Sequence, residues 1–518
     1  MSALGIYKFS LGSGGSSLKE VTTHNSTAKV MLVLLYIITI LVLAYTFVIT
    51  VYNLYFHPLA AYPGPFLARS TLLWRIYHSM GGRFHIAIDR QHRKYGSVFR
   101  VSPNELSFAS VESWKSIYGH PPAGKPSLIK SEFYEMYGAG FSSLCIGSER
   151  DPQKHNKMRK SLSAAFSTKA LSEQEDIVTK TIDKFVIRIG KDGGLETGGL
   201  NMTKWYEMIA FDILGEMAFG ESFHCMETGK PHFWSELILD HLYFITLADN
   251  LRRFPLVRTF AKLLFPSTVA VRNQNSVYSR DQVSKRLGKK TSRKDFLTNL
   301  VGKLENGEIE REEMNAHVST LVIAGGETVA TFLAATTFYL LKSIACYGRL
   351  REEIRNRFAS YGEINAASAQ QLPYLQAVIS EGLRIYPPGS QGFPRVSPGV
   401  FVDGRWVPKG AEIYTSAWTV THDERNFQSP MTFKPERWLD PNSKDIKEAS
   451  QPFSLGTRGC LGRNFAYMEI NLILAKMLWK YNLELLNPDM DWEGKSYVHV
   501  MWWKPEVKVR FLERKIDG

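Results

Sequence analysis

One uncharged run near the N-terminus constrains this chain more than any other feature of its sequence. Residues 30–52 read VMLVLLYIITILVLAYTFVITVY and contain no charged side chain. As an α-helix with a rise of about 1.5 Å per residue, this run spans about 34 Å, which exceeds a hydrocarbon core of about 30 Å. Signal-peptide apolar regions are shorter, and no small-residue cleavage pattern follows. We therefore predict a single transmembrane anchor over 30–52 rather than a secretory leader or a buried core helix.

The residues that flank this run give conflicting indications of its orientation. Lys19 and Lys29 precede it, whereas the nearest basic residue after it is Arg69, so a count of positive charges favours a cytosolic N-terminus. Asn25 begins an Asn-Ser-Thr glycosylation sequon, which is usable only on the lumenal side. The charge count and the sequon disagree, and the local sequence leaves the orientation open.

The rest of the chain is predicted to be one large domain behind a stiff connection. Residues 53–65 contain His57-Pro58 and Tyr62-Pro63-Gly64-Pro65, and proline restricts both itself and the preceding residue, so this stretch is predicted to be an extended hinge. Residues 66–518 show no internal repeat and no break in composition. Helical periodicity dominates, and strand-like pieces are few. The predicted helices lie at 202–218, 233–250, 312–342, 370–386 and 462–480, and the strand-like pieces at 97–108 and 400–416. The fold class is therefore mainly α with a minor β portion.

Charge and cysteine content narrow the possible functions. The chain carries 63 Lys and Arg against 50 Asp and Glu, a net charge of +13, which suits an anionic membrane surface, an acidic partner or nucleic acid. The basic run 285–294 (KRLGKKTSRK) has no interleaved aromatic residues, so we interpret it as a solvated loop between helices and expect no nucleic acid partner. Four cysteines without a CxxC spacing exclude a disulfide scaffold and a zinc-finger site and indicate a reduced compartment.

One cysteine lies where its thiol could ionise and bind a metal. Cys460 lies in the glycine-rich stretch 453–462 (FSLGTRGCLG), directly before a helical pattern. A cysteine at the start of a helix faces free amide groups and the positive end of the helix dipole, which favour the thiolate, and a thiolate can bind iron as an axial ligand. Gly456 and Gly462 would let the backbone approach a flat macrocycle closely. The other cysteines lack such surroundings and are interpreted as ordinary thiols: Cys145, Cys225 and Cys346.

The spacing in this stretch resembles the haem-binding signature of the cytochrome P450 superfamily, whose haem iron is held by a thiolate. Every fixed position of the pattern F-x-x-G-x-R-x-C-x-G is matched, by Phe453, Gly456, Arg458, Cys460 and Gly462. The resemblance extends from the proline hinge to the C-terminus. It implies the cytochrome P450 fold and a haem b cofactor, with Cys460 as the axial ligand of the iron.

A second motif of this resemblance lies inside the predicted helix 312–342. Residues 324–328 read Ala-Gly-Gly-Glu-Thr, and two glycines within a helix cost about 1 kcal/mol each relative to alanine. The resemblance implies that the helix loosens here to leave room for dioxygen, with Ala324 and Gly325 beside the cofactor. Thr328 would face the haem and help to deliver protons, and Glu327 would be its acidic partner. The alternative is a close helix–helix contact made by small residues.

Two further groups of residues are assigned through the resemblance. Glu381 and Arg384 share a helix face at positions i and i+3, and with Arg437 they resemble a structural Glu-Arg-Arg cluster joined by bidentate hydrogen bonds. The second group comprises the implied partners of the haem propionates, each of which has a surface position as its alternative: His155, Arg159, Arg395 and Arg458. The family usually has Trp where this chain has His155, so the assignment of that helix depends mainly on Arg159.

The resemblance also implies a reaction, a partner and a location. The implied activity is oxidation of an apolar small molecule, of the fungal polyketide or terpenoid kind, by dioxygen and electrons from NADPH. The electrons would come through NADPH–cytochrome P450 reductase, with cytochrome b5 as a further candidate donor. Two alternatives are a reductase-independent haem-thiolate isomerase or dehydratase, and a membrane-bound haem sensor without turnover. The Glu327-Thr328 pair disfavours both, because neither needs a proton relay.

This implied activity decides the orientation. The reductase and NADPH are cytosolic, and Cys460 must remain a reduced thiolate. We therefore predict an endoplasmic-reticulum anchor with residues 1–29 in the lumen and the domain 66–518 in the cytosol. Asn25 is then a candidate glycosylation site, whereas the second sequon, at Asn201, must stay unmodified.

Overall fold

A long apolar helix forms most of the N-terminal unit. The computed structural model describes residues 17–124, 126–138, 140–254, 266–289 and 293–515, and the chain divides into units of 1–60 and 61–518. Helix α1 (Ser17–Val51) continues into a π-helical turn, η1 (Tyr52–Phe56). The stretch Lys29–Phe56 has a mean hydropathy of 2.8 and none of its most apolar window is buried. An exposed apolar helix of this length suggests a single membrane anchor. The helix begins at Ser17, earlier than the predicted start of the span.

The predicted extended hinge over 53–65 is wrong in its first part. Residues 53–56 belong to the π-helical turn η1, His57 is extended with φ −68° and ψ 143°, residues 58–62 form a turn and a bend, and 63–65 have no regular structure. Proline constrains only its own position and the preceding residue, and the first proline of this stretch is Pro58. The residues before it therefore remain free to continue the helix.

The second unit is mainly helical, as predicted. Its α-helices are α2 (Phe66–Ser70), α3 (Leu73–Met80), α4 (Phe84–Tyr95), α5 (Val111–Tyr118), α6 (Pro152–Ser163), α7 (Thr168–Asp192), α8 (Met202–Phe219), α9 (Cys225–Thr228), α10 (Phe233–Leu251), α12 (Pro266–Gly288), α13 (Thr298–Glu305), α14 (Arg311–Lys342), α15 (Ile344–Arg357), α16 (Ala366–Gln370), α17 (Pro373–Ile385), α18 (Ala417–Thr421), α19 (Glu436–Leu439), α20 (Arg463–Lys480) and α21 (Trp492–Lys495). Short 3₁₀ helices are η2 (Glu132–Gly138), η3 (Ala164–Phe166), η4 (Tyr361–Glu363), η5 (Lys447–Ala449) and η6 (Gly456–Arg458). All five predicted helices and both strand-like pieces are present, with ends shifted by a few residues.

The strands in the described residues form four small sheets. They are β1 (Val98–Ser102), β2 (Glu105–Phe108), β3 (Ile129–Lys130), β4 (Leu200–Asn201), β5 (Arg395–Val396), β6 (Val400–Val402), β7 (Arg405–Val407), β8 (Glu412–Thr415), β9 (Tyr481–Leu485), β10 (Tyr497–His499), β11 (Met501–Trp503) and β12 (Lys508–Glu513). The largest sheet has the order β1-β2-β8-β5-β3 and is antiparallel except for the parallel pair β2–β8. The others are β4-β12-β9, β10-β11 and β6-β7.

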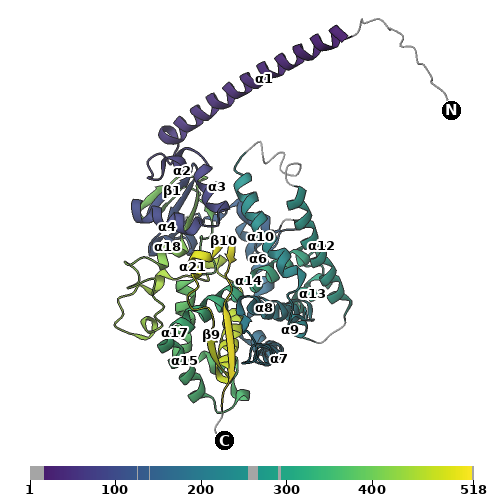
Figure 1. Cartoon of the computed structure of the whole chain (residues 1–518), viewed down its shortest axis with the longest axis vertical. Coiled ribbons are helices and arrows are strands. Elements are labelled where there is room, and N and C mark those ends of the chain that lie inside the picture. The colour runs from purple at the N-terminus through teal and green to yellow at the C-terminus, as the bar shows by residue number, and fades with distance from the viewer. Residues whose placement is uncertain (1–16, 125, 139, 255–265, 290–292, 516–518) are drawn as a thin grey trace, which may run out of the picture. The chain divides into compact units, whose positions relative to one another are not determined.

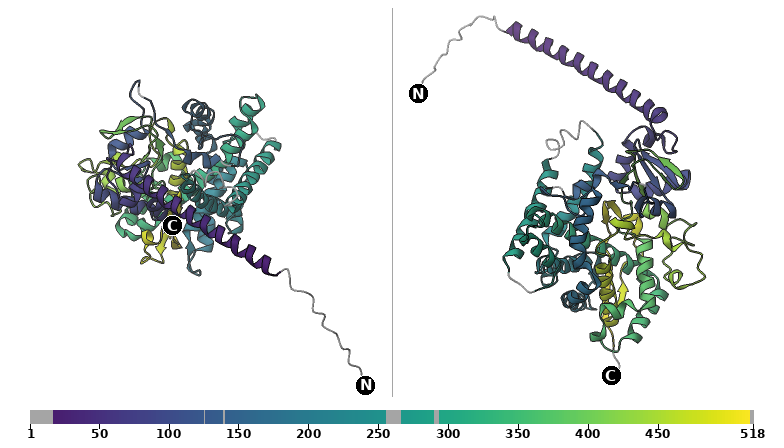
Figure 2. Two further views of the ribbon diagram at one scale, coloured as in Figure 1. Left: turned by 90° about the horizontal axis from the view of Figure 1, so that it is seen from above. Right: turned by 180° about the vertical axis from the view of Figure 1, so that it is seen from behind.

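Helix α14 forms the centre of this unit. It is apolar enough to cross a membrane by composition, with a mean hydropathy of 1.5, but 72% of its most apolar window is buried inside the protein. A helix that is apolar on most of its circumference must be surrounded by other elements, and α14 packs most extensively on α8. Figure 1 shows α8, α10, α12 and α13 on one side of the unit, with β1 and α2–α4 on the other, and the rear view in Figure 2 shows the same division.

The basic run 285–294 differs from its predicted structure. Lys285 and Arg286 lie in the last turn of α12, and residues 290–292 are outside the described residues. The guanidinium of Arg286 is buried and pairs with Asp295 (Nε–Oδ2, 3.0 Å). Part of the run is therefore a structural contact rather than a solvated loop, because a buried carboxylate requires a cation beside it.

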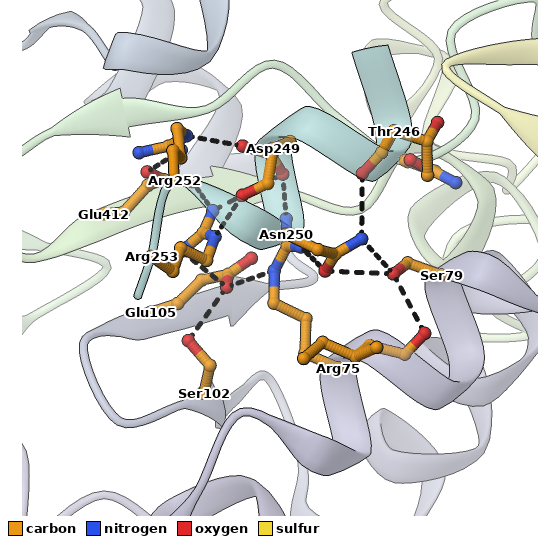
Figure 3. A network of polar contacts seen from close by, with 12 residues as sticks. Arg75, Ser79, Ser102, Glu105, Thr246, Asp249, Asn250, Arg252, Arg253 and Glu412 are labelled. Carbon is orange, nitrogen blue, oxygen red and sulfur yellow. Dashed lines mark hydrogen bonds and ion pairs between the residues drawn. The ribbon is translucent and has the colours of Figure 1, made fainter. Parts of the chain in front are cut away.

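A buried charge network joins the end of α10 to the largest sheet (Figure 3). Asp249 accepts hydrogen bonds from Arg75 of α3 and from Arg252, while Glu412 of β8 binds Arg252 and Arg253 at 2.9 and 2.6 Å. The network contains three arginines and three carboxylates, so the charges balance: Arg75, Arg252, Arg253, Glu105, Asp249 and Glu412. It fixes the position of α10, two of whose residues, Ser235 and Ile238, line the cavity described below.

Candidate functional site

The loop that carries Cys460 is a tight turn at the start of α20. The backbone N–H of Cys460 donates to the carbonyl of Phe453 at 2.8 Å, which folds the loop back on itself. Gly456 has a left-handed φ of +66°, and a Cβ there would collide with the carbonyl oxygen of Tyr118. A Cβ at Gly462 would meet open space. Gly456 is therefore required by the fold of the protein itself, whereas the predicted space for a macrocycle exists only at Gly462.

Cys460 differs from the other cysteines in exposure. Its side chain is exposed, whereas Cys145, Cys225 and Cys346 are buried. The protein around it nevertheless desolvates its thiol, and this burial raises the pKa of Cys460, although the N–H of Gly462 and the charge of Arg159 lower it. The effect expected from the helix start is therefore present but opposed by desolvation, and the thiolate form of Cys460 stays a prediction. Bonding to a metal cation would supply the missing stabilisation, since a coordinated thiol is deprotonated.

Two residues of the central helix form an open strip in an otherwise buried element. Ala324 is exposed and Thr328, one turn later, is half-buried, while most of the surrounding helix is buried. The Thr328 hydroxyl donates to the carbonyl oxygen of Ala324 at 2.8 Å. Helix α14 runs without a break through this point, and the expected room for dioxygen beside it stays a prediction.

The glycines of this motif serve helix packing. A Cβ on Gly325 would lie 2.9 Å from Leu214 of α8, and one on Gly326 would lie 3.5 Å from the same side chain. Real Cβ atoms do not approach other atoms as closely as 2.9 Å, so Gly325 is needed for the contact between α14 and α8. The alternative explanation, a close helix–helix contact, is therefore supported for Gly325, and the expected place of Ala324 and Gly325 beside the cofactor stays a prediction.

The carboxylate of Glu327 lies away from the open strip. It is buried and accepts a hydrogen bond from the Lys504 ammonium at 2.8 Å. Lys504 also binds Glu207 of α8 at 3.0 Å. Neither Lys504 nor Glu207 belongs to a sequence motif, because the three residues come from segments far apart in the chain.

The residues expected at the haem propionates lie near one another, with Arg395 and His155 buried and Arg159 and Arg458 half-buried. Arg458 donates to the carbonyl oxygens of Glu149 and Arg150 at 2.9 and 2.7 Å, and Arg395 donates to the Tyr134 hydroxyl at 3.0 Å. Burial lowers the pKa of Arg458 to about 10, and the neighbouring Arg395 adds to the effect. In the described residues, the hydrogen-bond acceptors of these two guanidiniums are all uncharged oxygen atoms.

The structure adds Lys130, which belongs to no sequence motif. Lys130 of β3 lies directly opposite Arg395 of β5 in the sheet, and its ammonium donates to two backbone carbonyls at 2.8 and 2.7 Å. Like charges opposite each other in a sheet are destabilising. Burial and the charges of Arg458 and Arg395 lower the pKa of Lys130 to about 7. This surplus of buried positive charge suits a bound anionic group.

The α6 residues contact this cluster and the cysteine loop. Arg159 donates to the carbonyl oxygen of Gly459, next to Cys460, at 2.7 Å. His155 is buried, and its Nδ1 has no hydrogen-bond partner in the described structure. Burial and the charges of Arg458, Lys130 and Arg159 lower the pKa of His155 to about 3, so it is neutral at pH 7. Neither residue occupies the surface position given as its alternative.

The Glu-Arg-Arg residues meet in the core, as predicted. Glu381 accepts hydrogen bonds from Arg384 at 2.8 and 2.9 Å and from Arg437 at 3.2 Å, and its side chain is fully buried. The Trp438 indole and the backbone N–H of Lys434 also donate to this carboxylate, both at 2.9 Å. One carboxylate thus joins α17 to the segment around α19.

Three features together point to a haem-thiolate protein. They are a buried helix with an open strip, an exposed cysteine at the start of a helix, and a group of cations next to the cysteine loop. The family model of cytochrome P450 matches residues 63–510, and the chain belongs to this family. One relative, "Cytochrome P450 monooxygenase ORF9" of Penicillium roqueforti (strain FM164), is 64% identical over 486 residues, covering 94% of this chain and 95% of the relative. Another, "Cytochrome P450 monooxygenase BOT4" of Botryotinia fuckeliana, is 57% identical over 467 residues, covering 90% and 89%. The relative "Cytochrome P450 monooxygenase BOA3" of Botryotinia fuckeliana (strain B05.10) is 38% identical over 487 residues, covering 92% and 95%.

These relationships establish the enzyme class and the cofactor. The protein is a cytochrome P450 monooxygenase, and the family binds haem. The described residues fit a haem on two structural grounds. Among the described residues, Lys130, Arg395 and Arg458 donate only to uncharged oxygen atoms and would pair with the haem propionates, and Cys460 presents an exposed thiol at the start of α20 that can ligate iron.

Proposed function

We propose that this monooxygenase takes electrons from NADPH through NADPH–cytochrome P450 reductase and oxidises an apolar small molecule, of the fungal polyketide or terpenoid kind. The observation that carries the proposal is the Cys460 loop, which exposes one thiol between the Arg159 contact and the start of α20. The fungal monooxygenases to which the chain is similar support the reaction and the general kind of substrate.

The haem is held by residues of four elements in this proposal. Cys460 would ligate the iron through its thiolate, and Phe453 and Gly456 shape its loop. Arg458, Arg395, Arg159 and Lys130 would bind the propionates, with His155 as a neutral hydrogen-bond partner. When bound, the haem supplies dioxygen activation, which its thiolate ligand promotes.

The α14 residues handle protons in this proposal. The Thr328 hydroxyl lies on the open strip with Ala324 and holds a proton at its Oγ1. Glu327 precedes it on the helix and supplies protons from the buried side. To hand a proton to Thr328, the Glu327 carboxylate must first take up a proton and then turn away from Lys504 as a neutral carboxyl group, so the strength of that ion pair sets how readily the transfer occurs.

Exposed basic residues next to the cysteine loop support docking of an acidic reductase. Lys154, Lys157 and Lys160 are exposed on α6, and Arg463 is exposed at the start of α20. The contact between Arg159 and Gly459 holds these two elements together. A basic face at this place would attract and orient a negatively charged electron donor, whether the reductase or cytochrome b5.

For the location, we propose an endoplasmic-reticulum anchor with the domain 66–518 in the cytosol and residues 1–29 in the lumen. The apolar helix α1 supports an anchor at this end of the chain. Asn25 lies in α1 and remains the candidate glycosylation site of the lumenal side. Thr203 of the second sequon is buried and its hydroxyl donates to the carbonyl of Pro505, which supports an unmodified Asn201.

A carbon monoxide difference spectrum and an NADPH assay test the proposed function. The reduced full-length protein should show the absorption band of thiolate-ligated haem, and NADPH oxidation should require added reductase. A band with reductase-independent turnover of an added organic peroxide would indicate an isomerase or dehydratase, and a band without any turnover would indicate a sensor. Comparison of the metabolites of a deletion strain with those of its parent would then identify the substrate.

A further inference from the structure

A buried lysine holds two glutamates from different helices. The Lys504 ammonium has three donors and three acceptors: Glu327 Oε2 at 2.8 Å, Glu207 Oε1 at 3.0 Å and the Trp502 carbonyl at 3.3 Å. Its side chain is 1% exposed. Burial by itself lowers the pKa of Lys504, but the two carboxylates raise it above its ordinary value, so the lysine stays charged.

The backbone around Lys504 is fixed to the start of α8. The Thr203 hydroxyl donates to the Pro505 carbonyl at 2.7 Å, and the backbone N–H of Met202 donates to the Val507 carbonyl at 2.7 Å. Because Glu207 lies one turn further along the same helix, the ammonium and both carboxylates are held by rigid elements. This arrangement is pre-organised and does not depend on a mobile loop.

The cluster contains two carboxyl groups and one ammonium. With all three ionised it carries a surplus negative charge in a buried place, which one bound proton removes. Burial raises the pKa of Glu207, and so does the charge of Glu327, while Lys504 and Lys204 oppose them. The side chain of Glu207 is 20% exposed, against 1% for Lys504 and 7% for Glu327, so it is the member of the cluster nearest to solvent.

A small cavity joins the two glutamates. Its volume is about 10 Å³, which is room for about one water molecule. Three polar residues line it, Glu207, Ser235 and Glu327, together with Gly326 and four apolar residues. Because both glutamates line this cavity, a water molecule in it would lie between Glu207 and α14.

We propose that Glu207 and Lys504 are positioning residues that supply Glu327 with protons. Glu207 takes a proton from solvent, its carboxyl O–H bond breaks as the cavity water accepts that proton, and the water passes another proton to the Glu327 carboxylate. Lys504 keeps the two carboxyl groups at a fixed separation and prevents both from being neutral at once. The proposal rests on the proposed role of Glu327 in proton delivery to the haem side of α14.

The test uses the full-length holoenzyme with reductase and NADPH and without organic substrate. Reduction of dioxygen to hydrogen peroxide takes two electrons and two protons, so it consumes one NADPH per dioxygen. Reduction to water takes four of each and consumes two NADPH per dioxygen. Failure of proton delivery shifts the NADPH-to-dioxygen ratio toward one. We expect Lys504→Met to decrease water formation about tenfold, less than the roughly 10²-fold or greater loss that follows removal of a general acid. Lys504→Arg, which keeps the charge, should restore part of it.

Glu207→Gln tests the uptake step with little change in shape. It should shift the ratio in the same direction and flatten the pH profile of water formation, because an amide cannot carry the exchanged proton. The matched control is Lys476→Met, which removes a lysine that is 3% exposed from its ion pair with Asp183 at 2.8 Å, between α20 and α7. This control should keep the wild-type ratio.

The outcomes separate this inference from the function on which it rests. Haem content and the carbon monoxide band are measured for each variant, and Glu207→Gln decides the result if Lys504→Met does not fold. A wild-type ratio and pH profile in both variants, with a changed ratio in Thr328→Ala, would overturn the inference and leave the proposed function intact. Absence of the carbon monoxide band from the unmodified enzyme would overturn both.

Discussion

Substitution of Glu381 by glutamine should destabilise the protein severely, although the two side chains have almost the same shape. Five hydrogen bonds end on this carboxylate: two from Arg384 and one each from Arg437, Trp438 and Lys434. An amide nitrogen in place of one carboxylate oxygen would turn a donor toward other donors and remove the charge that compensates two buried arginines. Arg384 is 0% exposed and Arg437 is 3% exposed, so solvent cannot replace the lost partner.

The expected magnitude follows from the number of bonds lost. Each hydrogen bond to a charged group contributes about 1.5–3 kcal/mol, and at least two are lost on either oxygen. This gives about 3–6 kcal/mol, close to the roughly 3–5 kcal/mol for breaking one member of a buried ion pair. Typical unfolding free energies are about 5–15 kcal/mol, so much of the stability would be lost.

Urea denaturation followed by tryptophan fluorescence, together with haem content, measures this effect. The midpoint should fall at an unchanged m-value, and little haem should be incorporated. The control is Glu484→Gln, which removes an ion pair with Arg510 at 2.9 Å on a carboxylate whose side chain is 50% exposed. Such a pair contributes about 0–1 kcal/mol. A Glu381→Gln protein with a wild-type midpoint and full haem would refute the structural role of the cluster.

Four further predictions concern the thiol, the proton donor, acid stability and orientation. Cys460→Ala should lose the carbon monoxide band of thiolate-ligated haem, whereas Cys145→Ala should keep it; a band in the first variant would contradict the ligand assignment. Thr328→Ala should keep its haem but release more peroxide per NADPH, and unchanged coupling would show that another group donates the proton. Burial lowers the pKa of His422 from 6.5 to about 3. Between these values only the unfolded chain binds this proton, so the unfolding free energy should fall as the pH drops below about 6.5. His422→Asn should flatten that dependence in urea titrations at several pH values, and an unchanged slope would exclude this residue as the cause. Protease added to intact microsomes should digest the domain 66–518, and a glycosidase-sensitive glycan on Asn201 would reverse the proposed topology.

The sequence by itself determined the family, the helices and the candidate cofactor loop. A loop such as FSLGTRGCLG carries its information in local spacing, and an amphipathic or apolar helix shows its period over a few turns, so both can be recognised without a fold. The long apolar run of α1 can also be recognised from local sequence, because as a helix it is long enough to span the hydrocarbon core of a membrane.

The tertiary structure alone decided which residues meet across the chain. Lys504 and Glu207 lie far from Glu327 in sequence, and no local pattern indicates that a lysine after β11 reaches a glutamate in α14. Lys130 became a candidate ligand residue only because the sheet places it opposite Arg395. The interpretation of Gly325 also depends on the tertiary structure. A glycine in a helix costs stability wherever it lies, but whether the space beside it belongs to a cofactor or to Leu214 depends on which helix packs there.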